Sequence, residues 1–179
     1  MKIGSNLGHV DRARLHPQLP LERLCTHRSE QLQVAFARMA CEALPVRADL
    51  AYEAVSQGLI LYAETESALD RPIALLNDIY GDELQLSPMM LRYRDGDARG
   101  EPHMGVRVLC AAQHFEAIRN DLKARRAHLL DVELRPPIGV LRATAPLALL
   151  LGYSKWLAHL TGESARDVMW FSHYATSNP

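Results

Sequence analysis

The chain has 179 residues, 48% of them hydrophobic and 23% charged, which is typical of a globular protein with its own core. Its net charge of −1 excludes binding to polyanions by bulk charge, so any nucleic-acid contact needs a local basic patch. The three cysteines, Cys25, Cys41 and Cys110, form neither a disulfide framework nor a closely spaced redox or metal pair. Because no apolar run could span a bilayer and no secretory signal is evident, we expect a cytoplasmic protein.

The sequence of the first half of the chain predicts alternating strands and helices. Residues 1–18 lack periodicity and are expected to form an irregular arm. A strand over 19–26 is followed by a helix with Ser29 as its N-cap. We expect that helix to bury one stripe: Leu32, Phe36, Met39 and Ala43. The next elements are strands over 47–54 and 58–63, a helix to Tyr80 with Pro72 in its first turn, and a strand over 83–93 interrupted at Ser87-Pro88.

The second half repeats this order. The polar, glycine-rich residues 95–101 are expected to link the halves. Phe115, Ile118 and Leu122 give the inner face of a helix over 113–126. The remaining elements are strands over 103–110, 129–134, 138–145 and 168–171, and a leucine-rich helix that ends at Thr161-Gly162. The order β-α-β-β-α-β occurs twice, so the sequence predicts an α+β protein of two ferredoxin-like modules, residues 19–94 and 102–179, each with an antiparallel sheet and helices on one face.

The second half carries a recognisable set of residues. They are Glu101-Pro102-His103-Met104, Asp121-Leu122, Arg125-Arg126, Arg142, Ala145-Pro146-Leu147, Leu151-Gly152-Tyr153, Leu157, Leu160-Thr161-Gly162, Phe171 and Tyr174. This set resembles domain V, the last ferredoxin-like domain of elongation factor G and its relatives. The family usually has glycine after the arginine pair, where this chain has Ala127.

The first half resembles domain III of the same translational GTPases. In the family the third strand leads into Gly-x-Gly-Glu-Leu-His, whereas residues 63–68 here keep only Glu66. The sequence contains no Gly-x-x-x-x-Gly-Lys-Ser/Thr phosphate loop, and it shows no match to the GTPase domain, domain II or domain IV. BipA and LepA also join domain III directly to domain V.

One basic cluster is a candidate contact site for RNA or a protein partner. Its members are Arg119, Lys123, Arg125, Arg126 and His128. Domain V of the family meets ribosomal RNA and the stalk base of the large subunit, and cations could contact phosphates. The alternative is structural, because cations at a helix C-terminus stabilise the helix dipole without any ligand. Without interleaved aromatic residues we favour the structural interpretation.

No other pattern indicates catalysis. The histidines show no metal-ligand spacing, and Gly152-Tyr153-Ser154-Lys155 lacks the elbow of a serine nucleophile. We therefore predict no enzyme activity, no cofactor and no metal. In the leucine-rich helix, Gly152 is expected to mark close approach of a neighbouring backbone. Tyr153 is expected to pack over a strand with its hydroxyl reaching a polar partner or solvent.

The leading functional hypothesis is a non-enzymatic, translation-factor-derived module that binds the ribosome or a translation-related partner without hydrolysing GTP. The alternative is a ferredoxin-like accessory module that binds a protein or ligand and has no ribosomal role. Neither hypothesis involves DNA or a membrane. A homo-oligomer remains open under both, and the function of residues 1–18 is not indicated by the sequence.

Overall fold

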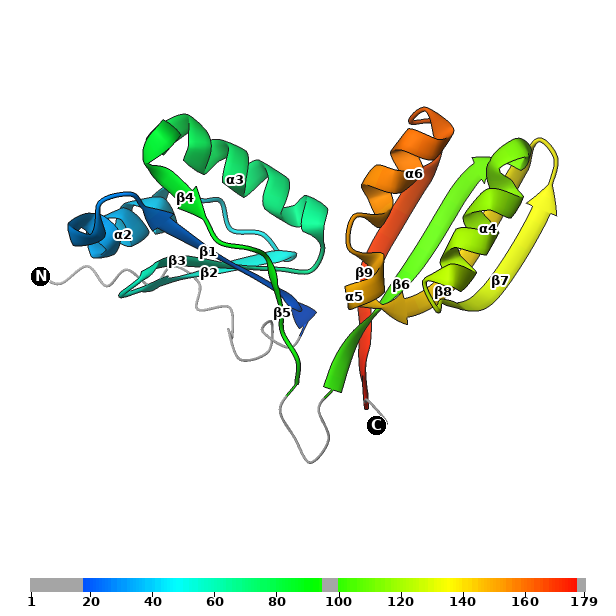
Figure 1. Cartoon of the computed structure of the whole chain (residues 1–179), viewed down its shortest axis with the longest axis horizontal. Helices are drawn as coiled ribbons and strands as arrows, with labels where there is room; N and C mark the ends of the chain where they lie inside the picture. Colours follow the sequence, from blue (N-terminus) through cyan, green and yellow to red (C-terminus); the bar gives the residue numbers. More distant parts are fainter. Residues whose placement is uncertain (1–17, 95–99, 177–179) are drawn as a thin grey trace, which may run out of the picture. The chain divides into compact units, whose positions relative to one another are not determined.

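The computed structural model describes residues 18–94 and 100–176. The chain divides after Met90 into two compact units, and each unit is an antiparallel sheet with helices on one face (Figure 1). This confirms the α+β class and the two ferredoxin-like modules. Residues 1–17 of the expected arm and residues 95–99 of the expected linker lie outside the described residues. No helix within the described ranges is long and apolar enough to cross a membrane.

The first module follows the predicted order. Its elements are β1 (Leu21–His27), α2 (Gln33–Ala43), β2 (Leu50–Val55), β3 (Gly58–Ala63), α3 (Glu66–Tyr80), β4 (Leu84–Leu86) and β5 (Met90–Leu91). The sheet order is β2-β3-β1-β4, and β5 also pairs with β1. Ser87 fixes the interruption between β4 and β5, because its Oγ accepts a hydrogen bond from the Leu24 N–H at 3.0 Å.

The start of α2 differs from the prediction. Ser29 makes no capping bond, and a 3-10 turn over Glu30–Leu32 precedes the helix. Gln33 fixes this entry instead, since its amide accepts the His27 N–H and donates to the His27 carbonyl. The tighter turn changes the helical phase.

The buried stripe of α2 is consequently shifted. Phe36 is buried as expected, but its buried neighbours are Ala37 and Ala40. Leu32 and Met39 are 47% and 60% exposed, so their predicted burial was wrong. The prediction for α3 also needs a correction, because Pro72 lies inside the helix and not in its first turn.

The second module has longer strands than the first. Its elements are β6 (Gly100–Ala111), α4 (Phe115–Ala124), β7 (His128–Arg135), β8 (Ile138–Pro146), α5 (Leu147–Leu150), α6 (Tyr153–Thr161) and β9 (Arg166–Thr176). The sheet order is β7-β8-β6-β9, with α4 and α6 over the same face (Figure 1). Met104, Val106 and Val108 of β6 are buried under these helices. Gly100 and Glu101, expected in the linker, belong to β6.

The leucine-rich helix is broken at Gly152. This residue has φ = 73°, in the left-handed region, and separates α5 from α6. A Cβ at Gly152 would meet no atom within 4 Å, so the predicted close approach of a backbone was wrong. Glycine suits this position because it adopts a positive φ without the clash that other residues meet.

Candidate functional site

Helix α4 carries two of the five predicted basic residues, Arg119 and Lys123, and Arg126 lies in the turn after the helix. Phe115, Ile118 and Leu122 are buried against the sheet, as predicted. The spacing i, i+4 therefore directs Arg119 and Lys123 away from the core. Lys123 and Arg126 are exposed. Arg119 is partly exposed and pairs with Glu116 at 2.9 Å, one turn earlier.

The turn after α4 forms without the family's glycine. Arg126 takes the left-handed conformation, with φ = 57°. The Ala127 N–H donates to the Leu122 carbonyl and the Arg126 N–H to the Lys123 carbonyl, both at 2.9 Å. These bonds satisfy carbonyls at the helix end as a C-terminal cap does. A non-glycine residue in this conformation costs about 1–2 kcal/mol, which the surrounding contacts must offset.

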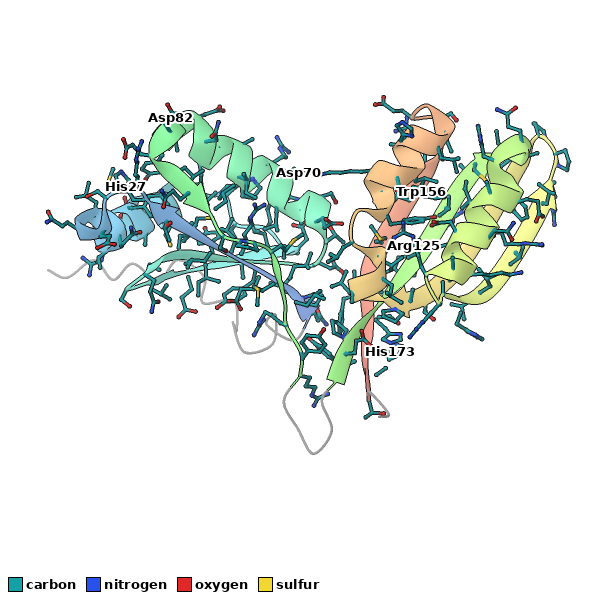
Figure 2. All side chains as sticks on the ribbon, in the orientation of Figure 1. His27, Asp70, Asp82, Arg125, Trp156 and His173 are labelled. Carbon is teal, nitrogen blue, oxygen red and sulfur yellow. The ribbon has the colours of Figure 1, made fainter. Side chains whose placement is uncertain are left out.

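Arg125 is held by contacts within the module. Its guanidinium donates to the Asp121 carboxylate at 2.7 Å and to the Leu149 carbonyl at 2.7 Å. It also lies over the rings of Tyr153 and Trp156, 5.3 and 5.7 Å from their centroids. Figure 2 labels Arg125 and Trp156 beside each other on the helical face. Arg125 thus joins α4 to the segment from α5 to α6, which is a structural role.

Tyr153 completes this contact. Its side chain is fully buried and its ring stacks on Trp156, with centroids 5.7 Å apart. Burial raises the pKa of the Tyr153 phenol, and the nearby Asp121 and Asp167 raise it further. Its hydroxyl has no hydrogen-bond partner among the described residues, so the predicted polar partner or solvent contact was wrong. The phenol is therefore neutral and works as a packing group.

His128 stands apart from the helical stripe. It is the first residue of β7, opposite Thr144 of β8, and its side chain is exposed. The structure therefore places Arg119 and Lys123 on α4 and Arg126 in the turn after it, turns Arg125 inward, and places His128 on the sheet.

The described residues contain no cluster of side chains that could bind a metal ion. In residues 18–94 and 100–176, no three His, Cys, Asp or Glu side chains could hold one metal ion. Ser154 donates to the Asp167 carboxylate at 2.6 Å. Burial raises the pKa of the Cys25 thiol to about 11, so this thiol is protonated at neutral pH and is a poor nucleophile.

A second set of exposed groups was missed by sequence reasoning. Arg107, Arg142, Arg166 and Trp170 lie on strands of the second sheet, and all four are exposed. The last strand was expected over 168–171 only, whereas β9 covers Arg166–Thr176. The signal that could have found them is alternation: Arg166, Val168 and Trp170 occupy every second position of one strand.

Comparison with known proteins finds similarity in the second module. Residues 99–179 match the family model described as Elongation factor G C-terminus. The elongation factor G of Pseudothermotoga lettingae is 38% identical over 74 residues, which cover 41% of this chain and 11% of that protein. The mitochondrial ribosome-releasing factor 2 of Danio rerio is 33% identical over 78 residues, covering 44% of this chain and 10% of the factor. The chain thus spans about a tenth of each relative.

A structural likeness extends over both modules. A solved structure from Thermus thermophilus aligns with a TM-score of 0.61 and 17% identity, covering 91% of this chain and 41% of that one. At this identity the likeness shows the fold alone. The resemblance to the C-terminal part of translation factors is therefore carried in sequence by the second module.

Proposed function

We propose that this chain is a translation-factor-derived module that binds the large ribosomal subunit without hydrolysing GTP. The single observation that carries the proposal is the match of residues 99–179 to the elongation factor G C-terminus. The names of the similar proteins, an elongation factor and a ribosome-releasing factor, support a ribosomal partner. The sequence contains no phosphate-binding loop of the Gly-Lys-Ser/Thr kind, which supports binding without nucleotide chemistry.

The first module, which we assign to residues 19–94, is proposed to derive from domain III of the same factors. The support is its β-α-β-β-α-β order together with the fold likeness that covers 91% of the chain. The second domain is assigned to residues 102–179. We further propose a cytoplasmic location, where ribosomes are found, and no catalytic role for either module.

The proposed contact surface is the outer stripe of α4 with the turn that follows. Lys123, Arg126 and His128 are exposed and available to phosphates. Arg119 and Arg125 belong to the same predicted cluster, but Glu116 and Asp121 pair with them. In this proposal those two arginines orient the helix end, and the three exposed residues make the contact.

Co-sedimentation with ribosomes tests the proposal. We expect the chain to pellet with the large subunit at low salt and to be released as salt rises, because phosphate contacts release counterions. The double change Lys123→Glu and Arg126→Glu should abolish pelleting. The matched control Arg71→Glu alters an exposed residue of α3 and should pellet like the parent. A chain that never pellets would contradict the proposal and favour the alternative, an accessory module without a ribosomal role.

Calorimetry with GTP tests the second part of the proposal. Because neither the sequence nor the described structure contains a phosphate-cradling loop at a helix N-terminus, we expect no binding heat. Micromolar affinity for GTP would contradict the assignment of a non-catalytic module.

A further inference from the structure

The second sheet has one face that its helices do not cover. Met104, Val106 and Val108 of β6 point into the core and are buried. Successive side chains of a strand alternate between faces, so Gly105, Arg107 and Leu109 point the other way. Strand pairing extends this open face across the sheet in rows. The rows are Gly105 with Thr144 and Trp170, Arg107 with Arg142 and Val168, and Leu109 with Val140 and Arg166.

The arginines of the open face are exposed and unpaired within the described structure. Arg107, Arg142 and Arg166 make no side-chain hydrogen bond or ion pair with any residue of 18–94 or 100–176. Arg107 and Arg142 are directly opposite on neighbouring strands. Like charges in that position destabilise a sheet, and an anion that bridges them would remove the repulsion.

Trp170 lies over the central strand beside these arginines. A Cβ on Gly105 would be 2.3 Å from Cε2 and 2.6 Å from Nε1 of Trp170, so the indole occupies the space that glycine leaves. The tryptophan is still 42% exposed. Farther along the same face, His103 is opposite His173, with ring centroids 5.2 Å apart. His173, labelled in Figure 2, is exposed. The open face therefore combines flat rings with unpaired positive charge.

Negative charge on this face is confined to its margins. Asp131 and Glu133 lie on the edge strand β7, opposite Arg142 and Val140, and Glu133 is already paired with Arg135 at 2.5 Å. Glu101 lies at the start of β6, two residues before His103. The strands β6 and β9, which carry Trp170, Arg107 and Arg166, keep a positive surface around the indole.

We propose that this open face binds single-stranded RNA, with one base stacked on Trp170 and phosphates held by Arg107, Arg142 and Arg166. Single strands offer bases and phosphates together, and stacking on aromatic rings with basic side chains alongside is how sheets bind them. A duplex hides its base faces, and unpaired bases are the ordinary state of RNA loops. This goes beyond the proposed ribosome contact, because Lys123 and Arg126 lie on the helical side of the module and only His128, opposite Thr144 at the edge of the sheet, borders the open face. The proposal can also be tested without ribosomes.

Fluorescence anisotropy tests whether a base stacks on Trp170. The probe is a labelled single-stranded RNA of mixed sequence, about 12 nucleotides long so that it spans one site of the size of the sheet. The full chain is used at about 50 mM salt. We expect measurable binding, weakened about tenfold or more by Trp170→Leu, because one stacked base is lost. Trp170→Phe keeps an aromatic ring and should restore most of the affinity. The control Val46→Ala, an exposed apolar position in the first module, should bind like the parent. Thermal melts of each variant separate lost binding from lost folding.

Salt dependence tests the phosphate part. The logarithm of the association constant falls with the logarithm of salt by about 0.7 per phosphate contact in single strands. The double variant Arg107→Gln/Arg142→Gln should therefore lower that slope by about 1.4. Arg71→Gln in the first module is the matched control and should leave the slope unchanged.

Several outcomes would overturn the proposal. They are no RNA binding by the parent at low salt, an equal affinity for duplex RNA, or a Trp170→Leu variant that is folded and binds like the parent. A single-stranded DNA of the same sequence that binds more tightly would overturn the choice of RNA. A dimer that forms in sedimentation velocity and dissociates on Trp170→Leu, without RNA binding, would assign the face to a second copy of the chain. Loss of ribosome pelleting with intact RNA binding would contradict only the proposed function.

Discussion

The second module carries arginines on two opposite surfaces, and the two groups differ in what surrounds them. Arg119, in the middle of α4, and Arg125, at its end, have carboxylate partners at 2.9 and 2.7 Å. On the open face of the sheet, Arg107, Arg142 and Arg166 have none among the described residues. The first group stabilises the fold, whereas the second leaves its charge available. A cluster of basic residues in a sequence thus indicates a binding site only when the fold has not already paired them with carboxylates.

The largest expected effect is on the helical side. Arg125→Ala removes the ion pair with Asp121, the bond to the Leu149 carbonyl and the contact with two rings. Since its side chain is only 21% exposed, we expect the free energy of unfolding to fall by about 2–3 kcal/mol. Urea denaturation measures this. Lys123→Ala, two positions earlier in the chain and exposed, should change stability by less than about 0.5 kcal/mol; equal losses would erase the contrast between paired and free cations.

The next effect concerns the sheet face. In Gly105→Ala the new Cβ would lie 2.3 Å from Trp170, so the indole must move, at a cost of about 1–3 kcal/mol. In a Trp170→Ala background the same change should cost close to nothing, because no ring is there to displace. A double-mutant cycle from thermal melts gives the coupling. Additive changes would mean that Trp170 does not rest on Gly105, and the stacking site would lose its geometric basis.

A smaller effect is expected at the break before α6. Gly152→Ala should lower stability by about 1 kcal/mol, because φ is 73° there although space is free. Gly152→Asn should cost less, since asparagine tolerates this conformation better. The break directly follows α5, which contains Leu149, whose carbonyl accepts a hydrogen bond from Arg125. Gly152 therefore also helps to position this carbonyl. Melting temperatures of the two variants decide the matter, and an alanine variant as stable as the parent would refute the backbone explanation.

The smallest effect is a pH dependence on the open face. Burial lowers the pKa of His103 below its usual 6.5, His173 lowers it further, and Glu101 acts in the opposite direction. The unfolded chain therefore takes up this proton first as the pH falls through about 6.5, so stability decreases from about pH 7 toward the lower folded pKa. Urea midpoints between about pH 8 and pH 5 should show this, and His103→Gln should flatten the curve. A parent and variant with the same pH profile would exclude His103 as the cause.

Sequence periodicity predicted the modules better than the surfaces. The element order and the buried face of α4, with Phe115, Ile118 and Leu122, follow from helical spacing and were confirmed. The stripe of α2 was wrong because a 3-10 turn and the Gln33 side chain set its phase, which periodicity alone does not reveal. Gly152 was recognised as unusual but given the wrong reason, since its φ depends on the break between α5 and α6.

For the candidate sites too, the sequence revealed the residue types but not their partners in the fold. The basic cluster around the end of α4 was recognised in the sequence. The sequence does not show that Arg125 faces inward, because this orientation depends on contacts with Asp121, Leu149, Tyr153 and Trp156. Of these partners only Asp121 is a near neighbour in the chain, and the other three belong to a later segment. The open face needed strand register, because Arg107, Arg142 and Trp170 come from three strands separated by dozens of residues. No local pattern brings them together.

A paired substitution tests the contrast between the two surfaces most directly. Arg125→Gln and Arg142→Gln each remove one positive charge from the same module, and both are measured for melting temperature and for affinity to the same short single-stranded RNA at low salt. The account predicts that Arg125→Gln lowers the melting temperature and keeps the affinity, whereas Arg142→Gln keeps or slightly raises the melting temperature, because it removes the repulsion with Arg107, and weakens binding. An Arg142→Gln variant that binds RNA like the parent, or an Arg125→Gln variant that loses affinity while melting like the parent, would contradict it.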